Sequence, residues 1–457
     1  MKIQLAKRDF RAIELTWNIL SNIKNKDKNY YINPTPEESS KLGQKPQLQI
    51  NFRIWMLREH TIKSLSEVVE KIYRSVDLKN TVSYETVYEN VKKILEDEIT
   101  SREQNLASKR DFSEILENIE KSINSKLSHF EFFFAIEGLL LEFERPKKIN
   151  CGNVEIFVFD QEFSDYLTKP CFEEADKQNL DWIKDVQEFL SENFLGHVCV
   201  KAITYGDAAI AKKQAYKQVR DLINYFRYIL CLFFYEKISE QMIKINLLSE
   251  VYSNGEKVLI RRAENDHVSL SQGRGRRPLQ TFNINVKKLQ DIRVNGFLDD
   301  FIEIINASSL TELEGCILTA VYWIGEAQNE SDLDIAFLKY WTALECIFSE
   351  KEDTTKSLAK GVATIIAFSN YDFARIEDTN KIYKDVVSLY KRRSDIIHRG
   401  MNYLADKVIS EVDVSKICKY AAWSILNLFD LRSIGYTTTD QIKEKNAELY
   451  AKLDIQK

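Results

Sequence analysis

The stretch FEFFFAIEGLLLEFERPKKINCGNVEIFVFD, residues 130–160, decides the fold class because the sequence pattern changes there. Ahead of it, apolar residues such as Val87, Val91 and Ile94 recur at intervals of three and four, which indicates amphipathic helices. Inside it, two runs rich in aromatic and β-branched residues flank a turn region at Pro146–Gly152. This pattern predicts a hairpin, or neighbouring strands of one sheet.

The residues before this stretch predict helices and one long loop. A first helix is expected over residues 6–25, and further amphipathic helices over Arg58–Val76 and Tyr84–His129. The polar segment Lys26–Gln49 contains three prolines and a glycine, so it is interpreted as a loop.

The residues after the stretch add strands and one long helix. HVCVKAITYG at residues 197–206 is a further strand candidate, and Asp207 is the expected N-cap of a helix that runs through Phe234. Short strands are expected in LLSEVYS, EKVLIRR and LQTFNIN, between residues 247 and 285.

From Val286 onward the pattern is helical throughout, and the chain as a whole is therefore expected to be α+β and mostly helical, with a small sheet in its N-terminal part. The helices are expected over Val286–Ile305, Thr311–Glu326, Ser331–Glu350, Thr354–Phe368, Thr379–Arg393 leading into the His398 segment, and Glu411–Ser433.

Three parts are expected along the chain, with the boundary at the linker-like composition of residues 307–310. They are residues 1–306, a mixed region that is helical over 1–129 and contains the sheet over 130–285; residues 307–435, a helical domain; and residues 436–457, a C-terminal helical tail.

Composition and charge exclude several classes of protein. The 457 residues include only 14 Gly and 6 Pro, which excludes collagen-like and low-complexity chains and allows long helices. The net charge of −5, from 64 basic and 69 acidic residues, excludes a polycation that coats nucleic acid. Any nucleic-acid site must therefore be a local basic patch.

The cysteines and the apolar runs predict a cytoplasmic protein. The seven cysteines are odd in number, scattered and without a Cys-x-x-Cys pair, so they indicate reduced thiols and no zinc site. The N-terminus lacks the apolar stretch of a signal peptide, and runs such as Tyr228–Tyr235 are too short to cross a bilayer. We therefore expect no membrane association, no metal and no cofactor.

The segment SLYKRRSDIIHRG, residues 388–400, combines a basic cluster with one of only five histidines in the chain. Cleavage of RNA without a metal needs a group of near-neutral pKa to move protons and fixed positive charge on the phosphate. His398 suits the first task and Arg393 the second. Ser394 and His398 are four residues apart and share a helix face.

Spacing alone does not make Arg393 and His398 a catalytic pair, because five residues correspond to about 140° around a helix. The two converge if the arginine side chain wraps, if the helix distorts, or if a second helix or subunit shares the groove. The alternative is a solvated basic helix end, in which His398 and Arg399 complement the helix dipole before Gly400.

The motif Arg393-Ser-Asp-Ile-Ile-His398, together with FLKYWTALECIF at residues 337–348, resembles the Apea-like HEPN group of the HEPN ribonuclease superfamily over about residues 308–435. The resemblance implies a helical bundle that forms a homodimer or higher homo-oligomer, with Arg–His motifs facing across one cleft. It also implies metal-independent endoribonuclease activity in abortive infection or toxin–antitoxin systems. Ser394 departs from the Asn, Asp or His that most often follows the motif arginine.

Further residues are assigned to the expected site. Glu345 would position Arg393 or Arg392 through an ion pair, because a buried arginine usually needs a carboxylate partner. The side chains expected to contact RNA phosphates are those of Lys391, Arg392 and Arg399, and of Arg274, Arg276 and Arg277 in the loop SQGRGRR. That loop is equally well interpreted as exposed and without a role.

The sequence thus predicts an antiphage or abortive-infection endoribonuclease whose residues 1–306 sense a trigger or hold the nuclease inactive. The expected partners are RNA as substrate and a phage-derived trigger or an antitoxin. The alternative prediction is a catalytically inactive HEPN-type module used for dimerisation, RNA binding or inhibition of a partner.

Overall fold

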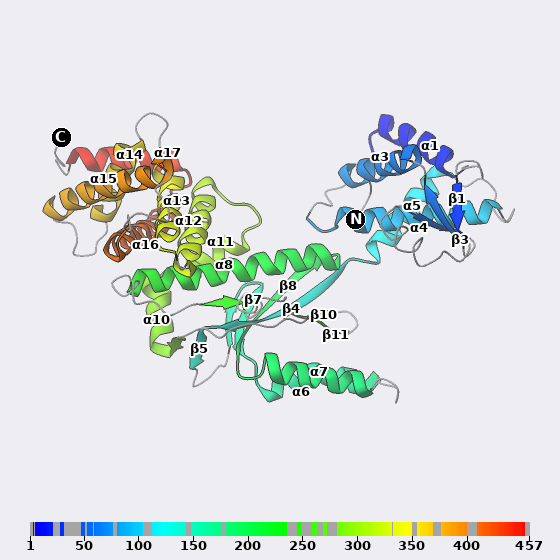
Figure 1. Ribbon diagram of the computed structural model, residues 1–457, viewed down its shortest axis with the longest axis horizontal. Coiled ribbons are helices and arrows are strands. Elements are labelled where there is room, and N and C mark those ends of the chain that lie inside the picture. The colour runs from blue at the N-terminus through cyan, green and yellow to red at the C-terminus, as the bar shows by residue number, and fades with distance from the viewer. Residues whose placement is uncertain are drawn as a thin grey trace. The chain divides into compact units, whose positions relative to one another are not determined.

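The structure is a computed structural model that describes most of the chain (Figure 1). The described residues are 3, 5–21, 28–31, 47–50, 53–57, 59–75, 80–103, 111–142, 148–174, 180–234, 245–247, 258–262, 268–271, 281–330, 332–349, 354–368, 376–399 and 409–452.

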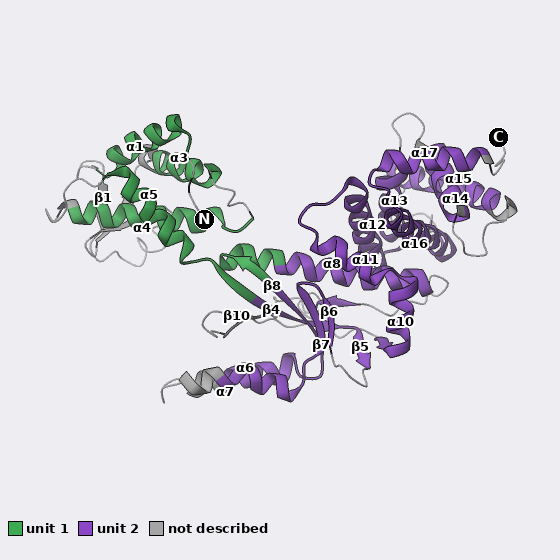
Figure 2. Ribbon diagram, turned by 180° about the vertical axis from the view of Figure 1, so that it is seen from behind, with its two compact units in different colours: residues 1–130, 204–214, 262–265 green, residues 131–203, 215–261, 266–457 purple. Residues whose placement is uncertain are grey.

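The chain forms two compact units (Figure 2). Unit 1 comprises residues 1–130, 204–214 and 262–265, and unit 2 comprises the remaining residues. The expected boundary at residues 306 and 307 falls inside unit 2, between two of its helices. The three-part division made from the sequence stays a prediction.

Unit 1 contains helices packed around one apolar core, whose buried side chains include Trp17, Val69, Val91 and Ile119. The helices are α1 (Lys7–Leu20), α3 (Glu59–Ser75), α4 (Tyr84–Glu103) and α5 (Phe112–Asn124).

Unit 1 also contains a sheet where a loop was expected. Strands β1 (Lys28–Tyr31) and β2 (Gln47–Ile50) both pair antiparallel with β3 (Arg53–Leu57). The interpretation of Lys26–Gln49 as a loop is therefore wrong at residues 28–31 and 47–49, and the helical region expected over residues 1–129 also contains strands. Prolines and polar residues dominate this segment and conceal two four-residue strands, whose register depends on pairing with β3 rather than on local pattern.

The main sheet has the strand order β11-β10-β4-β8-β7-β6, and β9 also pairs with β4. Each pairing β6–β7, β7–β8, β10–β11 and β4–β9 is antiparallel. The strands are β4 (Ser128–Glu137), β6 (Lys148–Cys151), β7 (Val154–Val158), β8 (Val198–Gly206), β9 (Asn246–Leu247), β10 (Val258–Arg262) and β11 (Val268–Ser271).

Strands 130–137 and 154–158 do lie in one sheet, but they are not neighbours, because β8 lies between β4 and β7. The first aromatic run is also divided at Gly138, whose φ is +83°. After this glycine, β5 (Leu139–Glu142) leaves the main sheet and pairs in parallel with β12 (Phe282–Asn285).

Helices cover both faces of the sheet in unit 2, with α6 (Gln161–Glu174) and α7 (Leu180–Asn193) on one face and α8 (Ala208–Phe234) on the other (Figure 1). Successive residues of β4 contact the two layers. The Phe133 ring centroid lies 5.6 Å from that of Phe163 in α6, and the Phe134 ring lies 5.7 Å from Tyr216 in α8. This alternation explains why β4 is apolar on both sides.

The expected N-cap of α8 is confirmed. Asp207 Oδ1 accepts a hydrogen bond of 2.8 Å from the backbone N–H of Ile210. Asp207 Oδ2 accepts a second bond, 2.6 Å long, from the backbone N–H of Ser83 in the same unit. Burial alone would raise the pKa of this carboxyl, but these hydrogen bonds outweigh it and lower the pKa.

The remainder of unit 2 is a helical bundle, and the expected α+β, mostly helical fold class is confirmed. Trp341, Leu344 and Phe348, which recur at intervals of three and four, form a buried stripe in its core. The helices are α10 (Val286–Asn295), α11 (Leu298–Asn306), α12 (Glu312–Asn329), α13 (Leu333–Phe348), α14 (Thr354–Phe368), α15 (Ile376–Arg399), α16 (Glu411–Ser433) and α17 (Thr439–Lys452).

One expected helix is divided in two. Residues 286–305 were predicted as a single helix, but α10 ends at Asn295 with Gly296 as its C-cap, and Phe297 adopts a left-handed φ of 54°. The Gly296 N–H donates to the carbonyl of Ile292, and the Tyr225 hydroxyl donates to the Gly296 carbonyl. A long-range contact with α8 thus stabilises a break that local periodicity does not reveal.

None of the described helices is long and apolar enough to cross a membrane.

Candidate functional site

The basic cluster near the end of α15 is held against α13 by an ion pair. Arg393 Nη2 lies 2.9 Å from Glu345 Oε1 and donates a 3.2 Å hydrogen bond to Oε2. Both side chains are only about one-fifth exposed. The expectation that Glu345 pairs with Arg393 or Arg392 is therefore confirmed, and Arg393 is the partner.

Two aromatic rings support Arg393. Its Cζ lies 5.5 Å from the ring centroid of Tyr390, one turn earlier in α15. The Tyr390 ring in turn makes an edge contact with the buried Trp341 of α13, at 5.5 Å between centroids. A carboxylate and an aromatic ring together reduce the rotamers open to the guanidinium, which prepares a fixed positive charge.

Arg392 points to a different helix. Its Nη1 pairs with Asp413 Oδ2, and Asp413 is buried whereas the arginine is 42% exposed. Asp413 also accepts a 3.0 Å bond from the backbone N–H of Ser410, so it completes a capping box at the start of α16. Sequence reasoning missed Asp413, although Ser410-x-x-Asp413 is a capping pattern that marks a helix start.

The remaining residues of the motif lie on another face of α15. Lys391 is exposed and Ser394 is half-buried. The side chains of His398 and Arg399 lie outside the described residues, but their backbone continues α15 as regular helix. Position 398 follows Lys391 by seven residues and Ser394 by four, so it shares their face and is about 140° from Arg393.

The second basic cluster lies outside the described residues, namely Arg274, Arg276 and Arg277. The described chain of that segment ends with β11 at Ser271.

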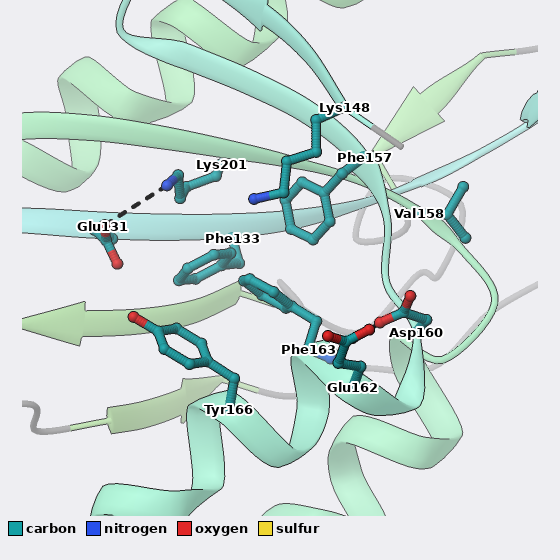
Figure 3. A pocket seen from close by; sticks show the side chains of 10 residues that line it. All are labelled: Glu131, Phe133, Lys148, Phe157, Val158, Asp160, Glu162, Phe163, Tyr166 and Lys201. Atoms are coloured by element: carbon teal, nitrogen blue, oxygen red, sulfur yellow. Dashed lines mark hydrogen bonds and ion pairs between the residues drawn. The ribbon is translucent and has the colours of Figure 1, made fainter. Parts of the chain in front are cut away.

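A separate cavity of about 390 Å³ lies in unit 2 between the sheet and α6 (Figure 3). Phe133, Phe163 and Tyr166 form one wall, and the ammonium groups of Lys148 and Lys201 lie opposite them (Figure 3). Lys148 Nζ lies 5.9 Å from the centroid of the Phe163 ring. Sequence reasoning assigned the aromatic run around Phe133 to a strand and did not detect this cavity.

Both lysines of the cavity wall are paired with carboxylates. Glu155 lies between two lysines, 2.9 Å from Lys201 Nζ and 3.1 Å from Lys148 Nζ, and Lys201 also lies 3.7 Å from Glu131. Burial opposes ionisation of Glu155, but the two lysines outweigh it and lower the pKa. The four side chains form a ladder of alternating charge across β4, β8, β7 and β6, which is the cross-strand arrangement that stabilises a sheet.

No group of three or more histidine, cysteine, aspartate or glutamate side chains that could hold a metal ion occurs in the described part of the chain. Comparisons of the chain with protein-family models, with curated proteins and with solved structures found no match.

Proposed function

We propose that this protein is a metal-independent endoribonuclease of the HEPN type, active in the cytoplasm in antiphage defence or abortive infection. The observation that supports the proposal is the Arg393–Glu345 ion pair on Tyr390, because it joins the two sequence motifs on which the resemblance depends. An arginine fixed in this way suits a phosphate on which charge develops during the reaction.

In the proposed reaction the neighbouring 2′-hydroxyl of RNA attacks the phosphorus. His398 serves as general base or general acid, and takes the proton from the 2′-hydroxyl or gives one to the departing 5′-oxygen. The P–O5′ bond breaks, and the products are a 2′,3′-cyclic phosphate and a 5′-hydroxyl. Arg393 stabilises the phosphate charge, Arg392, Ser394, Lys391 and Arg399 bind the strand, and Glu345 positions Arg393.

The proposed active unit is a dimer. Arg393 faces α13 of its own bundle, whereas the position of His398 lies about 140° away on α15. One chain therefore does not direct both positions into a single cleft of its own, and a second copy provides the missing half. Ile397 lies one turn after Arg393, and Val412 directly precedes Asp413. Their side chains are 47% and 63% exposed and supply apolar surface for such a contact.

One observation favours a second candidate function. Both Arg392 and Arg393 are paired with carboxylates, so their charge is already neutralised within the bundle. Such pairs also serve to hold three helices together, which fits a catalytically inactive module that dimerises, binds RNA or inhibits a partner. In either case the proposed role of residues 1–306 is to respond to a phage-derived trigger or to an antitoxin.

The test incubates the full-length protein with RNA in EDTA and identifies the product ends. Wild type is expected to yield 2′,3′-cyclic phosphate ends, and His398→Ala and Arg393→Ala are expected to lower the cleavage rate at least about 100-fold. Lys384→Ala, an exposed position on the same helix, is the matched control and is expected to retain the wild-type rate. Cleavage that survives His398→Ala would reject the mechanism, and RNA binding without cleavage by the wild type would favour the inactive module.

A further inference from the structure

A second cavity, of about 340 Å³, opens between α14 and α17 of unit 2. The Phe348 ring at the end of α13 closes one side of it. Gly361 allows α14 to approach this ring, because a Cβ at that position would lie 2.5 Å from a Phe348 ring carbon. The cavity volume is within the range of small-ligand pockets.

The described lining of the cavity carries three basic side chains. Lys356, Lys360 and Lys443 line it, and none of the described lining residues is acidic. Lys443 Nζ lies 3.2 Å from Asp440, but that carboxylate is 82% exposed. An exposed pair of this kind is weak, so a ligand anion can replace Asp440 at little cost.

Neutral hydrogen-bond donors accompany the lysines. The hydroxyls of Ser357 and Tyr450 and the amide of Asn446 line the same cavity. Burial, and then the nearby Tyr383, raise the pKa of Tyr450, so its phenol remains protonated and able to donate.

The cavity also presents a ring face. Lys360 Nζ lies 4.8 Å from the centroid of the Tyr450 ring, a cation–π contact that holds the ammonium at the cavity wall. Three ammonium groups, several neutral donors and an aromatic ring match a ligand that combines phosphate with a planar base.

We propose that the cavity between α14 and α17 binds the phosphates of a nucleotide, either free or within an RNA strand. The lysines contact the phosphate oxygens, and the Tyr450 ring contacts the base. The site shares no residue with the Arg393 cluster, and its occupancy does not depend on the chain being a nuclease.

The test measures binding by the full-length protein of two probes, ATP and a fluorescent RNA decamer that carries 2′-O-methyl groups and so lacks the attacking hydroxyl. The variant is Lys360→Gln/Lys443→Gln, and the control is Lys445→Gln on α17, which does not line the cavity. The double variant is expected to weaken binding at least tenfold, and the control less than twofold. Circular dichroism and the melting temperature verify that both variants are folded.

Salt dependence provides a second readout. For the RNA probe, the logarithm of the association constant falls linearly with the logarithm of the salt concentration. Removal of two phosphate contacts is expected to reduce the slope of this line by about 1.4, since each contact contributes about 0.7 on a single strand. Loss of ATP binding in the double variant identifies a free nucleotide as ligand, and loss of RNA binding alone identifies the strand.

The proposal is overturned if neither probe binds the wild type, or if the double variant binds both probes as the wild type does. These outcomes are separate from the nuclease test, because Arg393→Ala is expected to leave ATP binding unchanged. A chain that binds ATP in this cavity and cleaves no RNA would refute the proposed nuclease and support the nucleotide site.

Discussion

Arg393 illustrates how a single side chain acquires a defined place only through distant residues. Glu345 is 48 positions away in sequence and lies on another helix, yet it accepts the arginine's hydrogen bond. The ion pair was expected because an arginine within a bundle needs a carboxylate. Glu345 pairs with Arg393 and not with Arg392 because adjacent residues of α15 point about 100° apart. Arg392 therefore lies against Asp413 on α16.

Substitution of Glu345 by glutamine tests the positioning role. Because the ion pair is lost while the shape is kept, we expect the free energy of unfolding to fall by about 1–2 kcal/mol and the rate of RNA cleavage at saturating RNA to fall about tenfold or more. Denaturant unfolding and single-turnover kinetics measure the two effects. A stability loss without any change in the rate constant would show that Glu345 only packs the bundle.

Asp221 on α8 is a second residue whose environment predicts a measurable effect. Burial raises the pKa of its carboxyl to about 6, although Lys217 and Arg220 oppose the rise. A raised pKa means that the folded state holds the proton more tightly than the unfolded state. Asp221 therefore contributes stability below about pH 4, and this contribution is lost as the pH rises through 6.

The variant Asp221→Asn removes this titration. It is expected to raise the free energy of unfolding by about 1–2 kcal/mol at pH 7.5 and to leave it nearly unchanged at pH 4. Asp185→Asn, an exposed position on α7, is the matched control. Equal effects of Asp221→Asn at both pH values would contradict the burial argument.

At the scale of elements, local sequence patterns predicted whether a segment is a helix or a strand better than they predicted where an element begins, ends or is interrupted. The helices α12, α13, α14 and α16 begin and end within three residues of the predicted bounds. The division between α10 and α11 and the strands β1 and β2 were not predicted, because a tertiary hydrogen bond supports the first and strand pairing supports the second.

The start of α8 is an element whose local signal and tertiary contacts agree. Asp207→Ala removes the N-cap and also leaves the Ser83 N–H without its acceptor, so we expect a loss of about 1–2 kcal/mol in the free energy of unfolding. Lys213 is exposed in the next turn of α8, and Lys213→Ala is expected to change the free energy of unfolding by less than about 0.5 kcal/mol.

The pH dependence of that loss follows from the lowered pKa of Asp207. Its stabilisation is complete above the unfolded pKa of about 4, and it is lost as the pH falls through the lower folded pKa. Chemical unfolding at pH 7 and at pH 3 measures the difference. If Asp207→Ala lowered the free energy of unfolding as much at pH 3 as at pH 7, this pH dependence would be contradicted.

At the scale of the whole molecule, the proposed dimer makes a prediction about mixtures of inactive variants. If Arg393 of one chain acts with His398 of the other, a mixture of Arg393→Ala and His398→Ala chains forms mixed dimers with one intact site each. Statistical assembly then restores about a quarter of the wild-type cleavage rate.

The control mixture combines His398→Ala with the double variant Arg393→Ala/His398→Ala, and no recovery is expected from it. Native mass spectrometry verifies that mixed dimers form. Mixed dimers without recovered cleavage would exclude a site shared between chains.

The sequence by itself determined the type of most elements, because hydrophobic spacing, turn residues and the Asp207 cap act over a few residues. These signals were sufficient for the α+β, mostly helical class. The need of a buried arginine for a carboxylate was sufficient to predict the ion pair of Glu345. Only the tertiary structure decided that β8 lies between β4 and β7, that Arg392 pairs with Asp413, and that three lysines surround one cavity. Those features join residues far apart in the chain. They are stabilised by long-range packing and charge, about which the local spacing of residues carries no information.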